Sequence, residues 1–407
     1  MYIADLHIHS KYSRATSKEM TPEILAKYAK EKGVSLLGTG DAIHPKYLEE
    51  LKEKLKPTSR YGIYEYDGVD FILSGEISNI YSQDGKLRKI HTVLLYPDFE
   101  SVKAVQKKLA PYGSIFADGR PIFGLSLKKT IELVREVSDE IMIIPAHIWT
   151  PWFSLFGSNS GFDSIEECCG ELSDEIIALE TGLSSDPPMN WRLSALDKYT
   201  LVSNSDAHSP SRIGREANVF AHPVDFNELR EILKNEDSTR FLFTIEFFPE
   251  EGKYHYDGHR NCKVSLHPRE SIKLHNVCPV CGRPLTVGVL HRVEDLADRP
   301  EGFRPPGKIG YKNLVPLDEI IADALEVGKE SKRVRAEYEN MVKHLGPELE
   351  ILLQIPYGDM EGRVNEKIIE GIRMVREGKV KVVPGYDGIY GKIEIFPKQE
   401  TKQMSLF

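Results

Sequence analysis

The stretch Tyr2-Ile3-Ala4-Asp5-Leu6-His7-Ile8-His9-Ser10, at residues 2–10, is an apolar run that ends in two histidines. In an extended strand, side chains two positions apart point to the same face, so His7 and His9 can both bind one metal ion. Further apolar runs, each typical of a short strand, follow at residues 34–40, 70–76, 91–96, 141–147, 175–180 and 200–206.

Amphipathic stretches separate these runs and carry helix boundaries. Thr21-Pro22-Glu23 combines an N-cap residue with proline at the first helical position, and Gly33 ends that helix. Seven strands that alternate with helices predict an α/β fold with a largely parallel sheet. In α/β barrels, functional residues gather at the C-terminal ends of the strands.

Length and composition are those of a globular protein. The chain has 407 residues, which suggests two or three domains, and 41% of its residues are hydrophobic and 28% charged. No apolar run approaches the roughly 18 residues of a membrane span. Met1 leads directly into the first apolar run without a secretory signal, so we expect a cytoplasmic protein.

Histidines and carboxylates fall at the ends of the predicted strands. The set is His7, His9, Asp41, Glu76, His91, His147, Asp206 and His208. Neutral imidazoles combined with carboxylates suit divalent ions such as Zn, Mn, Fe or Mg. Eight groups exceed the needs of one ion, so we expect two or three metals, which clamp phosphoryl oxygens and make hydroxide at neutral pH. Glu180, at the end of the sixth predicted strand, is a further candidate to face this site.

Three of the five cysteines form a pattern typical of zinc binding. Cys278-Pro279-Val280-Cys281-Gly282 is a zinc knuckle, in which two thiolates straddle a tight turn. His259 and Cys262 complete a His-x2-Cys-x15-Cys-x2-Cys pattern. His267 is a rival fourth ligand, and we favour His259 because its spacing mirrors the knuckle. Three thiolates leave no open Lewis-acid position, so we expect one structural Zn.

The charge is unevenly distributed along the chain. The net charge is −9, yet residues 252–312 hold eleven Lys or Arg against six Asp or Glu, a local balance of about +5. Such a basic stretch can bind phosphate groups, although a solvated surface explains it equally well. His291-Arg292 and the residues through Pro300 form a loop dense in Arg and His that could bind phosphate or a base edge, or be a salt-bridged surface turn.

The order His-x-His, Asp, Glu, His, His and Asp-x-His resembles the PHP (polymerase and histidinol phosphatase) family over about residues 1–245. The resemblance implies a PHP-type distorted seven-stranded β/α barrel that hydrolyses phosphoesters with a multinuclear metal centre, and it implies that the eight strand-end groups are ligands. The family usually has Thr-Asp-His at the end of the second strand, where this chain has Gly40-Asp41-Ala42-Ile43-His44. Either His44 substitutes for the histidine missing at Ala42, or one metal site is weaker or absent.

The zinc pattern extends the resemblance to essentially the whole chain. The barrel, the segments 258–262 and 278–294, and a mainly helical C-terminal region together resemble the endonuclease Q family. Members of that family cut DNA on the 5′ side of deaminated bases (uracil, hypoxanthine, xanthine) and of abasic sites. The resemblance implies a metal-dependent DNA repair endonuclease with Zn, Mg or Mn in the barrel, which extrudes the damaged base from the duplex.

Four regions follow from these patterns. We expect the PHP barrel at 1–250, the zinc-binding module with its basic loop at 251–315, a helical and β region at 316–397, and a flexible tail at 398–407. Within the third region, helical patterns span 317–345 and 365–377, and a β segment spans 380–396.

Two other functions remain open. One is a PHP-type phosphatase for a small phosphomonoester such as histidinol phosphate, which would need neither the zinc module nor the basic stretch. The other is a non-catalytic DNA-binding or clamp-associated protein, which would not need so complete a set of ligands. Cleavage of p-nitrophenyl phosphate without cleavage of uracil-containing DNA would indicate the phosphatase.

Aromatic residues and the tail suggest further contacts. Trp149, Trp152, Phe153 and Phe156 follow His147, and they either form a pocket or wedge for an extruded base or pack in the core. The tail segment Gln403-Met404-Ser405-Leu406-Phe407 resembles a sliding-clamp binding motif, which makes the DNA sliding clamp an expected partner.

Overall fold

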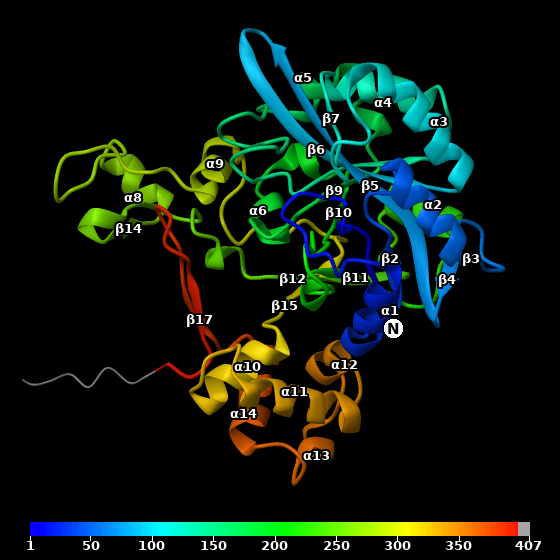
Figure 1. Cartoon of the computed structure of the whole chain (residues 1–407). Coiled ribbons are helices and arrows are strands. Elements are labelled where there is room, and N and C mark those ends of the chain that lie inside the picture. The colour runs from blue at the N-terminus through cyan, green and yellow to red at the C-terminus, as the bar shows by residue number, and fades with distance from the viewer. Residues whose placement is uncertain (398–407) are drawn as a thin grey trace, which may run out of the picture.

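A computed structural model of the chain describes residues 1–397, which form three regions (Figure 1). A large α/β region carries the N-terminal half, a small module around α8 stands beside it, and a layer of helices from α10 to α14 lies below. The tail with its predicted clamp-binding motif lies outside the described residues.

One mixed sheet forms the centre of the first region, where a largely parallel sheet was predicted. Its strands are β1 (Tyr2–Asp5), β2 (Leu36–Gly38), β3 (Lys56–Pro57), β4 (Ile63–Tyr66), β5 (Val69–Gln83), β6 (Lys86–Tyr96), β7 (Ile122–Phe123), β8 (Met142–Pro145), β11 (Ala217–Phe220), β12 (Phe241–Glu246) and β15 (Gly310–Asn313). Strands β1, β2 and β5 run parallel, whereas β11 pairs antiparallel with β1, and β6 pairs antiparallel with β5 and β8. The parallel pair β9 (Ala178–Glu180) and β10 (Thr200–Val202) forms a separate small sheet.

The long hairpin of β5 and β6 is the main departure from the predicted topology. Asp84 and Gly85 connect the two strands, with φ angles of 53° and 71°, which suits a two-residue hairpin turn. Glu76 pairs with Val93 inside this hairpin, and His91 pairs with Ser78. Both strands are longer than predicted, because β5 continues to Gln83 and β6 begins at Lys86. Glu76 therefore does not close a strand, and His91 does not open one.

Helices lie between the strands of the first region, and α1 lies where the sequence predicts a helix. They are α1 (Pro22–Lys32), α2 (Pro45–Lys54), α3 (Phe99–Leu109), α4 (Leu127–Arg135), α5 (Ile165–Cys169), α6 (Pro187–Asn190) and α7 (Phe226–Asn235). Short 3-10 helices lie at Ala110–Tyr112, Gly170–Glu175, Ser194–Leu196, Pro210–Arg212, Pro249–Glu251 and Arg260–Cys262. Helix α1 begins at Pro22 and ends at Gly33, whose φ of 84° requires the left-handed conformation that glycine favours. Its face with Leu25 and Ala29 is buried.

The second region is small and rejoins the main sheet. It consists of β13 (Asp257–His259), β14 (Val264–Leu266), α8 (Pro268–Lys273) and α9 (Val289–Leu296). The chain then returns through β15, which pairs parallel with β12 of the large sheet. The last residues of the predicted second region thus pack with the first.

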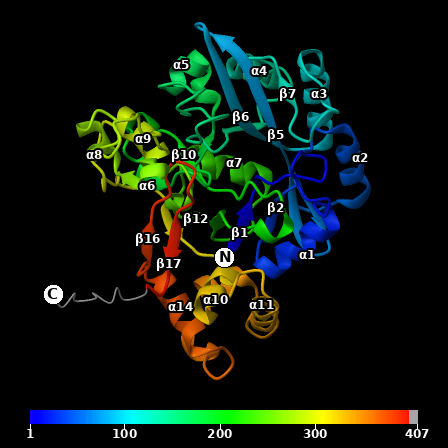
Figure 2. The same ribbon diagram turned by 60° about the vertical axis from the view of Figure 1, so that its left-hand side comes forward.

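The third region is helical and ends in a hairpin. Its elements are α10 (Leu317–Leu325), α11 (Lys332–Leu345), α12 (Glu348–Leu353), α13 (Tyr357–Met360), α14 (Glu366–Arg376), β16 (Lys381–Val383) and β17 (Lys392–Glu394). The predicted helical stretch at 317–345 is broken after Leu325, where Glu326 takes a left-handed conformation with a φ of 54°. The β16–β17 hairpin reaches from this region to the second one (Figure 2).

Contacts at the hairpin tip tie the second and third regions together. The Tyr256 N–H donates to the Gly385 carbonyl at 2.9 Å. The Asp387 carboxylate accepts from the Arg260 N–H at 2.7 Å and from the Thr286 hydroxyl at 2.6 Å. Among residues 1–397, no helix combines the length and the apolar character that a bilayer crossing requires.

Candidate metal centre

Four predicted ligands meet beyond the end of β1. His7, His9, Glu76 and Asp206 each offer one ligand atom, and these four atoms lie within 4.8 Å of one another. The Nε2 atom of His9 lies 3.0 Å from Oδ1 of Asp206 and 3.2 Å from Oε2 of Glu76. The Nε2 atom of His7 lies 3.6 Å from the same Glu76 oxygen. This first group is the arrangement expected of side chains that share one cation.

Neighbouring strands bring this group together. His7 and His9 directly follow β1, and the bridge between Ile8 and Ala207 places the segment after β10 beside them. The His9 N–H donates to the Ala207 carbonyl at 3.0 Å. The bridge therefore brings both members of the His-x-His pair and Asp206 of the Asp-x-His pair to one place.

A second group shares Glu76 with the first. Glu76, His91 and His147 also offer ligand atoms within 4.8 Å of one another. Oε1 of Glu76 lies 2.8 Å from Nδ1 of His91 and 3.1 Å from Nε2 of His147, while Oε2 faces the first group. A carboxylate that directs one oxygen to each group is suited to bridge two cations.

Buried polar atoms at this centre lack protein partners. Nε2 of His7, Nε2 of His9 and Oδ1 of Asp206 are buried without a hydrogen bond. Such atoms cost free energy unless a ligand satisfies them. Burial raises the pKa of Glu76, but the positive charges of His91 and Arg120 outweigh it and hold that pKa well below its ordinary value. Ionised carboxylates and unpartnered imidazole nitrogens fit divalent cations.

Asp41 lies beside these groups and orients one of their members. Its Oδ1 atom is 3.1 Å from Nδ1 of His9. Its Oδ2 atom accepts from the Ser10 N–H at 2.7 Å and from the Ser13 hydroxyl at 2.8 Å. Among the described residues, Asp41 belongs to neither candidate ligand group. The contacts fix the His9 ring so that Nε2 points into the centre.

Two predicted histidines also stand outside both groups in the described part of the chain. His208 is half-exposed at the rim, where its ring lies 4.4 Å from the His9 ring and its Nδ1 lies 2.9 Å from the Asp206 carbonyl oxygen. His44 caps α2 instead, and its ring stacks on Tyr12 at 4.3 Å. Among residues 1–397, His44 thus lies in neither candidate ligand group.

Glu180 supports both groups from behind. Its Oε1 lies 3.0 Å from Nδ1 of His7, and its Oε2 accepts from the His147 N–H at 2.8 Å. The Asn204 amide donates to Oε1 at 2.9 Å. Glu180 does face the site, as a partner that orients ligands, which is a common role for a carboxylate behind a metal-binding histidine.

Arg120 is the functional residue that sequence reasoning missed. Its Nη1 atom lies 3.1 Å from Oε2 of Glu76. Arg120 lies in a loop without a motif, and only the folding of that loop over β5 brings it to the centre. No local sequence signal could have identified it.

The zinc pattern also converges in space. His259, Cys262, Cys278 and Cys281 form a further group with ligand atoms within 4.8 Å, and Nδ1 of His259 lies 3.4 Å from Sγ of Cys281. The rival candidate, His267, caps α8 in a capping box with Glu270. The geometry therefore favours His259 as the fourth zinc ligand.

The four aromatic residues after His147 divide into two pairs. Trp149 and Phe156 are buried, with ring centroids 4.9 Å apart, so they belong to the core. Trp152 is 51% exposed, and Phe153 lies at the edge of the centre with its ring 4.7 Å from the His91 ring. Phe153 has a φ of 62°, a strained conformation for an aromatic residue.

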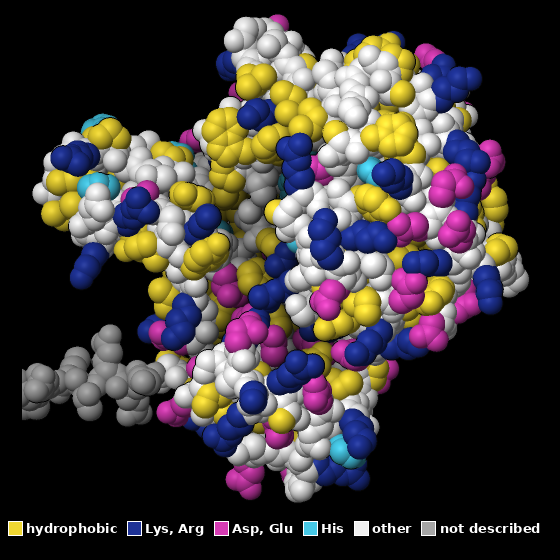
Figure 3. All heavy atoms as spheres, in the orientation of Figure 1, with side chains coloured by type: hydrophobic (Ala, Val, Ile, Leu, Met, Phe, Trp, Pro, Cys, Tyr) yellow, Lys and Arg dark blue, Asp and Glu magenta, His cyan; other side chains and the backbone are white. Residues whose placement is uncertain are grey.

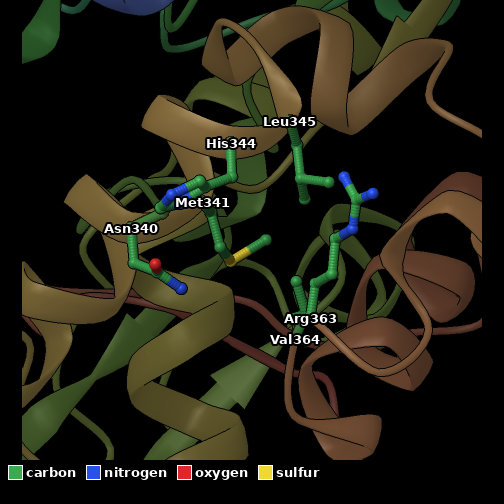
Figure 4. A pocket seen from close by; sticks show the side chains of 6 residues that line it. All are labelled: Asn340, Met341, His344, Leu345, Arg363 and Val364. Atoms are coloured by element: carbon green, nitrogen blue, oxygen red, sulfur yellow. The ribbon is translucent and has the colours of Figure 1, made fainter.

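One face of the molecule is hollowed. Figure 3 shows a hollow between the second region and the main body, with Lys and Arg side chains on both sides. A separate cavity of about 320 Å³ lies between α11 and the segment that precedes α14, with Met341, His344 and Arg363 among its lining (Figure 4). None of the candidate ligands lines that cavity.

Comparison with known proteins identifies relatives of the whole chain. The lesion-specific endonuclease PfuEndoQ from Pyrococcus furiosus has a crystal structure that matches with a TM-score of 0.86 and 35% identity, covering 97% of this chain and 95% of that one. A crystal structure of endonuclease Q with a 27-mer duplex substrate, which has an abasic lesion at the active site, matches at a TM-score of 0.85 and 35% identity over 100% of both chains.

Shorter matches concern parts of the chain or of the relative. The family described as the MJ0043 C-terminal domain matches residues 316–379. The uncharacterized protein MJ0043 of Methanocaldococcus jannaschii is 34% identical over 263 residues, which are 62% of this chain, but the chain spans only 32% of that protein. Because the match to the endonuclease Q structures extends over nearly the full length of both chains, this chain belongs to the endonuclease Q family.

Proposed function

We propose that the protein is a metal-dependent DNA endonuclease that cuts on the 5′ side of deaminated bases (uracil, hypoxanthine, xanthine) and of abasic sites. The centre would be of the PHP type, on a distorted β/α barrel. The observation that carries the proposal is the pair of ligand groups that share Glu76, in a chain of the endonuclease Q family.

The residues of the centre would prepare it for phosphodiester hydrolysis. When bound, divalent metals would lower the pKa of a water molecule and neutralise charge on the scissile phosphate. Glu180 and Asp41 would accept hydrogen bonds from the Nδ1–H groups of His7 and His9, which leaves the Nε2 lone pairs directed at the metals. Glu76 would bridge the two ligand groups.

The second region would hold DNA next to the centre. Arg260, Lys263, Lys273 and Arg283 are exposed there, and within residues 1–397 they form no ion pair. Unpaired cations of this kind bind phosphates without regard to sequence. Trp152 is exposed and precedes Phe153, whose ring lies 4.7 Å from the His91 ring, so Trp152 would be available to stack on a base that has left the duplex.

Cleavage mapping tests the proposal. Duplexes that carry one uracil, hypoxanthine, xanthine or abasic site are end-labelled and incubated with Mg²⁺ or Mn²⁺, beside an undamaged duplex. We expect a single cut on the 5′ side of each lesion, none in the undamaged duplex, and none with Asp206→Asn, which should still bind the damaged DNA. Hydrolysis of p-nitrophenyl phosphate without lesion-dependent cutting would indicate a phosphatase instead.

A further inference from the structure

Arg120 is a permanent positive charge at the metal centre. Its guanidinium contacts Glu76, the carboxylate that belongs to both ligand groups, at 3.1 Å. The side chain is 27% exposed, so it lies between the buried ligands and solvent. Arginine is always charged in proteins, so this group keeps its charge at any working pH.

The backbone around Arg120 is fastened on both sides. The Gly119 N–H donates to the Tyr12 carbonyl at 3.1 Å, and the Pro121 carbonyl accepts from the Ser78 N–H at 3.0 Å. A Cβ atom on Gly119 would collide with the Asp41 carboxylate, so only glycine allows this close approach. The loop is therefore held against the segment after β1 and against β5, and Arg120 is positioned at the centre between them.

The contact with Glu76 occupies only part of the Arg120 guanidinium. Glu76 also has His9, His91 and His147 within 3.2 Å of its oxygens. Among residues 1–397, the bond from Nη1 to Glu76 is the one side-chain hydrogen bond of Arg120, so the rest of its planar fork is available to a ligand. A planar guanidinium fork is well matched to two phosphate oxygens.

We propose that Arg120 binds a non-bridging oxygen of the scissile phosphate and that it is a catalytic residue of this centre. Negative charge on the phosphoryl oxygens is what a fixed guanidinium stabilises during displacement, because the donor needs no reorganisation. The inference rests on the proposed endonuclease function, which supplies the phosphodiester.

A thermodynamic cycle tests the contact. Affinity for an abasic duplex is measured by fluorescence anisotropy with Ca²⁺ replacing Mg²⁺, with a normal phosphate or an uncharged methylphosphonate at the scissile linkage. For the parent protein, we expect the methylphosphonate to weaken binding about tenfold, as loss of a hydrogen bond to a charged group would. For Arg120→Gln, we expect weaker binding of the normal duplex and less than about a twofold further loss with the methylphosphonate.

Matched controls define the outcome that would overturn the inference. Arg14 is 78% exposed and pairs with Asp118 in the same loop, so Arg14→Gln should leave the methylphosphonate effect intact. If the methylphosphonate weakens the binding of Arg120→Gln by the same factor as that of the parent, Arg120 does not contact the scissile phosphate. A parent protein that cuts lesion DNA without such coupling contradicts this inference alone, whereas one that neither binds nor cuts it contradicts the proposed function as well.

Metal content separates a catalytic role from a structural one. Arg120→Gln should keep the metal content and melting temperature of the parent, because Arg120 is not a ligand. Arg120→Lys should restore part of the cleavage rate, since it returns the charge without the fork. Loss of metal from Arg120→Gln would show that the residue maintains the centre, which would overturn the catalytic role.

Discussion

Glu76 and Asp41 show how residues of one type differ in role through their position. Both carboxylates are fully buried near His9, but Glu76 lies in both candidate ligand groups and Asp41 in neither of those found among residues 1–397. Glu76 faces the ligand atoms themselves, whereas Asp41 contacts the opposite side of the His9 ring. Removal of these two charges should therefore have different consequences.

We expect Glu76→Gln to lose metal from both groups and to cleave lesion DNA at least about a hundredfold more slowly, because no charged bridge remains. Asp41→Asn should keep metal in the second group and lose about ten- to a hundredfold in activity or metal affinity, since it acts only through His9. Mass spectrometry of metal content and single-turnover cleavage measure both. A Glu76→Gln variant with its full metal content would contradict the bridging assignment.

Two buried glutamates outside the centre make stability depend on pH. Glu216 and Glu246 are fully buried. Glu216 directly precedes Ala217 and Glu246 directly follows Ile245, and Ala217 pairs with Ile245 between β11 and β12, so the two glutamates are neighbours. Burial, aided by the charge of Asp186, raises the pKa of Glu246 to about 8, against hydrogen bonds such as that from Thr244. The folded protein therefore holds this carboxyl protonated at pH values where the unfolded chain ionises it.

A carboxyl whose folded pKa is raised contributes stability below its unfolded pKa and loses that contribution as pH rises through the folded value. For Glu246 this window runs from the ordinary value of 4.5 to about 8. As the pH rises from about 5.5 to about 8.5, the parent should lose this contribution and Glu246→Gln should not. The difference between the melting temperatures of Glu246→Gln and the parent should therefore grow by roughly several degrees over that range. Glu330 is exposed, so Glu330→Gln is the control. If the melting temperatures of the parent, Glu246→Gln and Glu330→Gln change equally with pH, Glu246 is not a buried neutral carboxyl.

At the scale of elements, the Cys/His group of the predicted zinc site lies in a module that has little core of its own. The strands β13 and β14 have three residues each, so a metal is the natural source of local stability. We expect Cys278→Ser combined with Cys281→Ser to lose one zinc and to lower the melting temperature, while the centre around Glu76 keeps its metals. Cys168→Ser, on α5, should retain all zinc. If the double variant melts like the parent, the site is not structural.

The segment after β8 carries one tryptophan for the core and one for the surface. Trp149 is buried and donates from Nε1 to Asn190 at 2.8 Å, whereas Trp152 is 51% exposed beside Lys89. We expect Trp149→Ala to destabilise the protein by about 3–5 kcal/mol. Trp152→Ala should leave the melting temperature almost unchanged and weaken binding of lesion DNA by about 1–3 kcal/mol. Equal binding of lesion DNA by the parent and Trp152→Ala would exclude a stacking role.

At the scale of the whole molecule, three regions act as a frame around the centre. A continuous cluster of buried apolar residues joins the first region to the helices of the third region. The β16–β17 hairpin links the third region to the second through Asp387 and backbone hydrogen bonds. Neither smaller region is an isolated appendage, so both are held in a defined position relative to the centre.

The segment 398–407 adds a predicted partner. We expect a synthetic peptide of residues 396–407 to bind the cognate sliding clamp, because Gln403 can occupy a polar pocket while Leu406 and Phe407 fill an apolar one. The same peptide with Leu406→Ala and Phe407→Ala should bind at least about tenfold more weakly, which a fluorescence titration measures. Equal, weak binding by both peptides would end this prediction. A tethered nuclease would gain from a higher local concentration at the DNA.

The sequence by itself predicted the α/β class, a strand in each of the seven apolar runs, and the chemistry of the ligands. These features follow from local periodicity and from residue types at strand ends, which depend on neighbours within a few positions. The His-x-His pair illustrates this, because the alternation of an extended chain predicts both members on one face, and both join the first ligand group. The Cys/His pattern was readable because each of its two halves, His259 with Cys262 and Cys278 with Cys281, spans only three positions.

Only the tertiary structure decided which groups share a centre. The antiparallel hairpin at Asp84-Gly85 places Glu76 next to His91, and a parallel arrangement would not. The positions of Asp41 behind His9, of His44 at a helix cap and of Arg120 over Glu76 depend on register and on the path of loops. These are contacts between residues far apart in the chain, whose free energy comes from packing across the fold and leaves no periodic trace in the sequence.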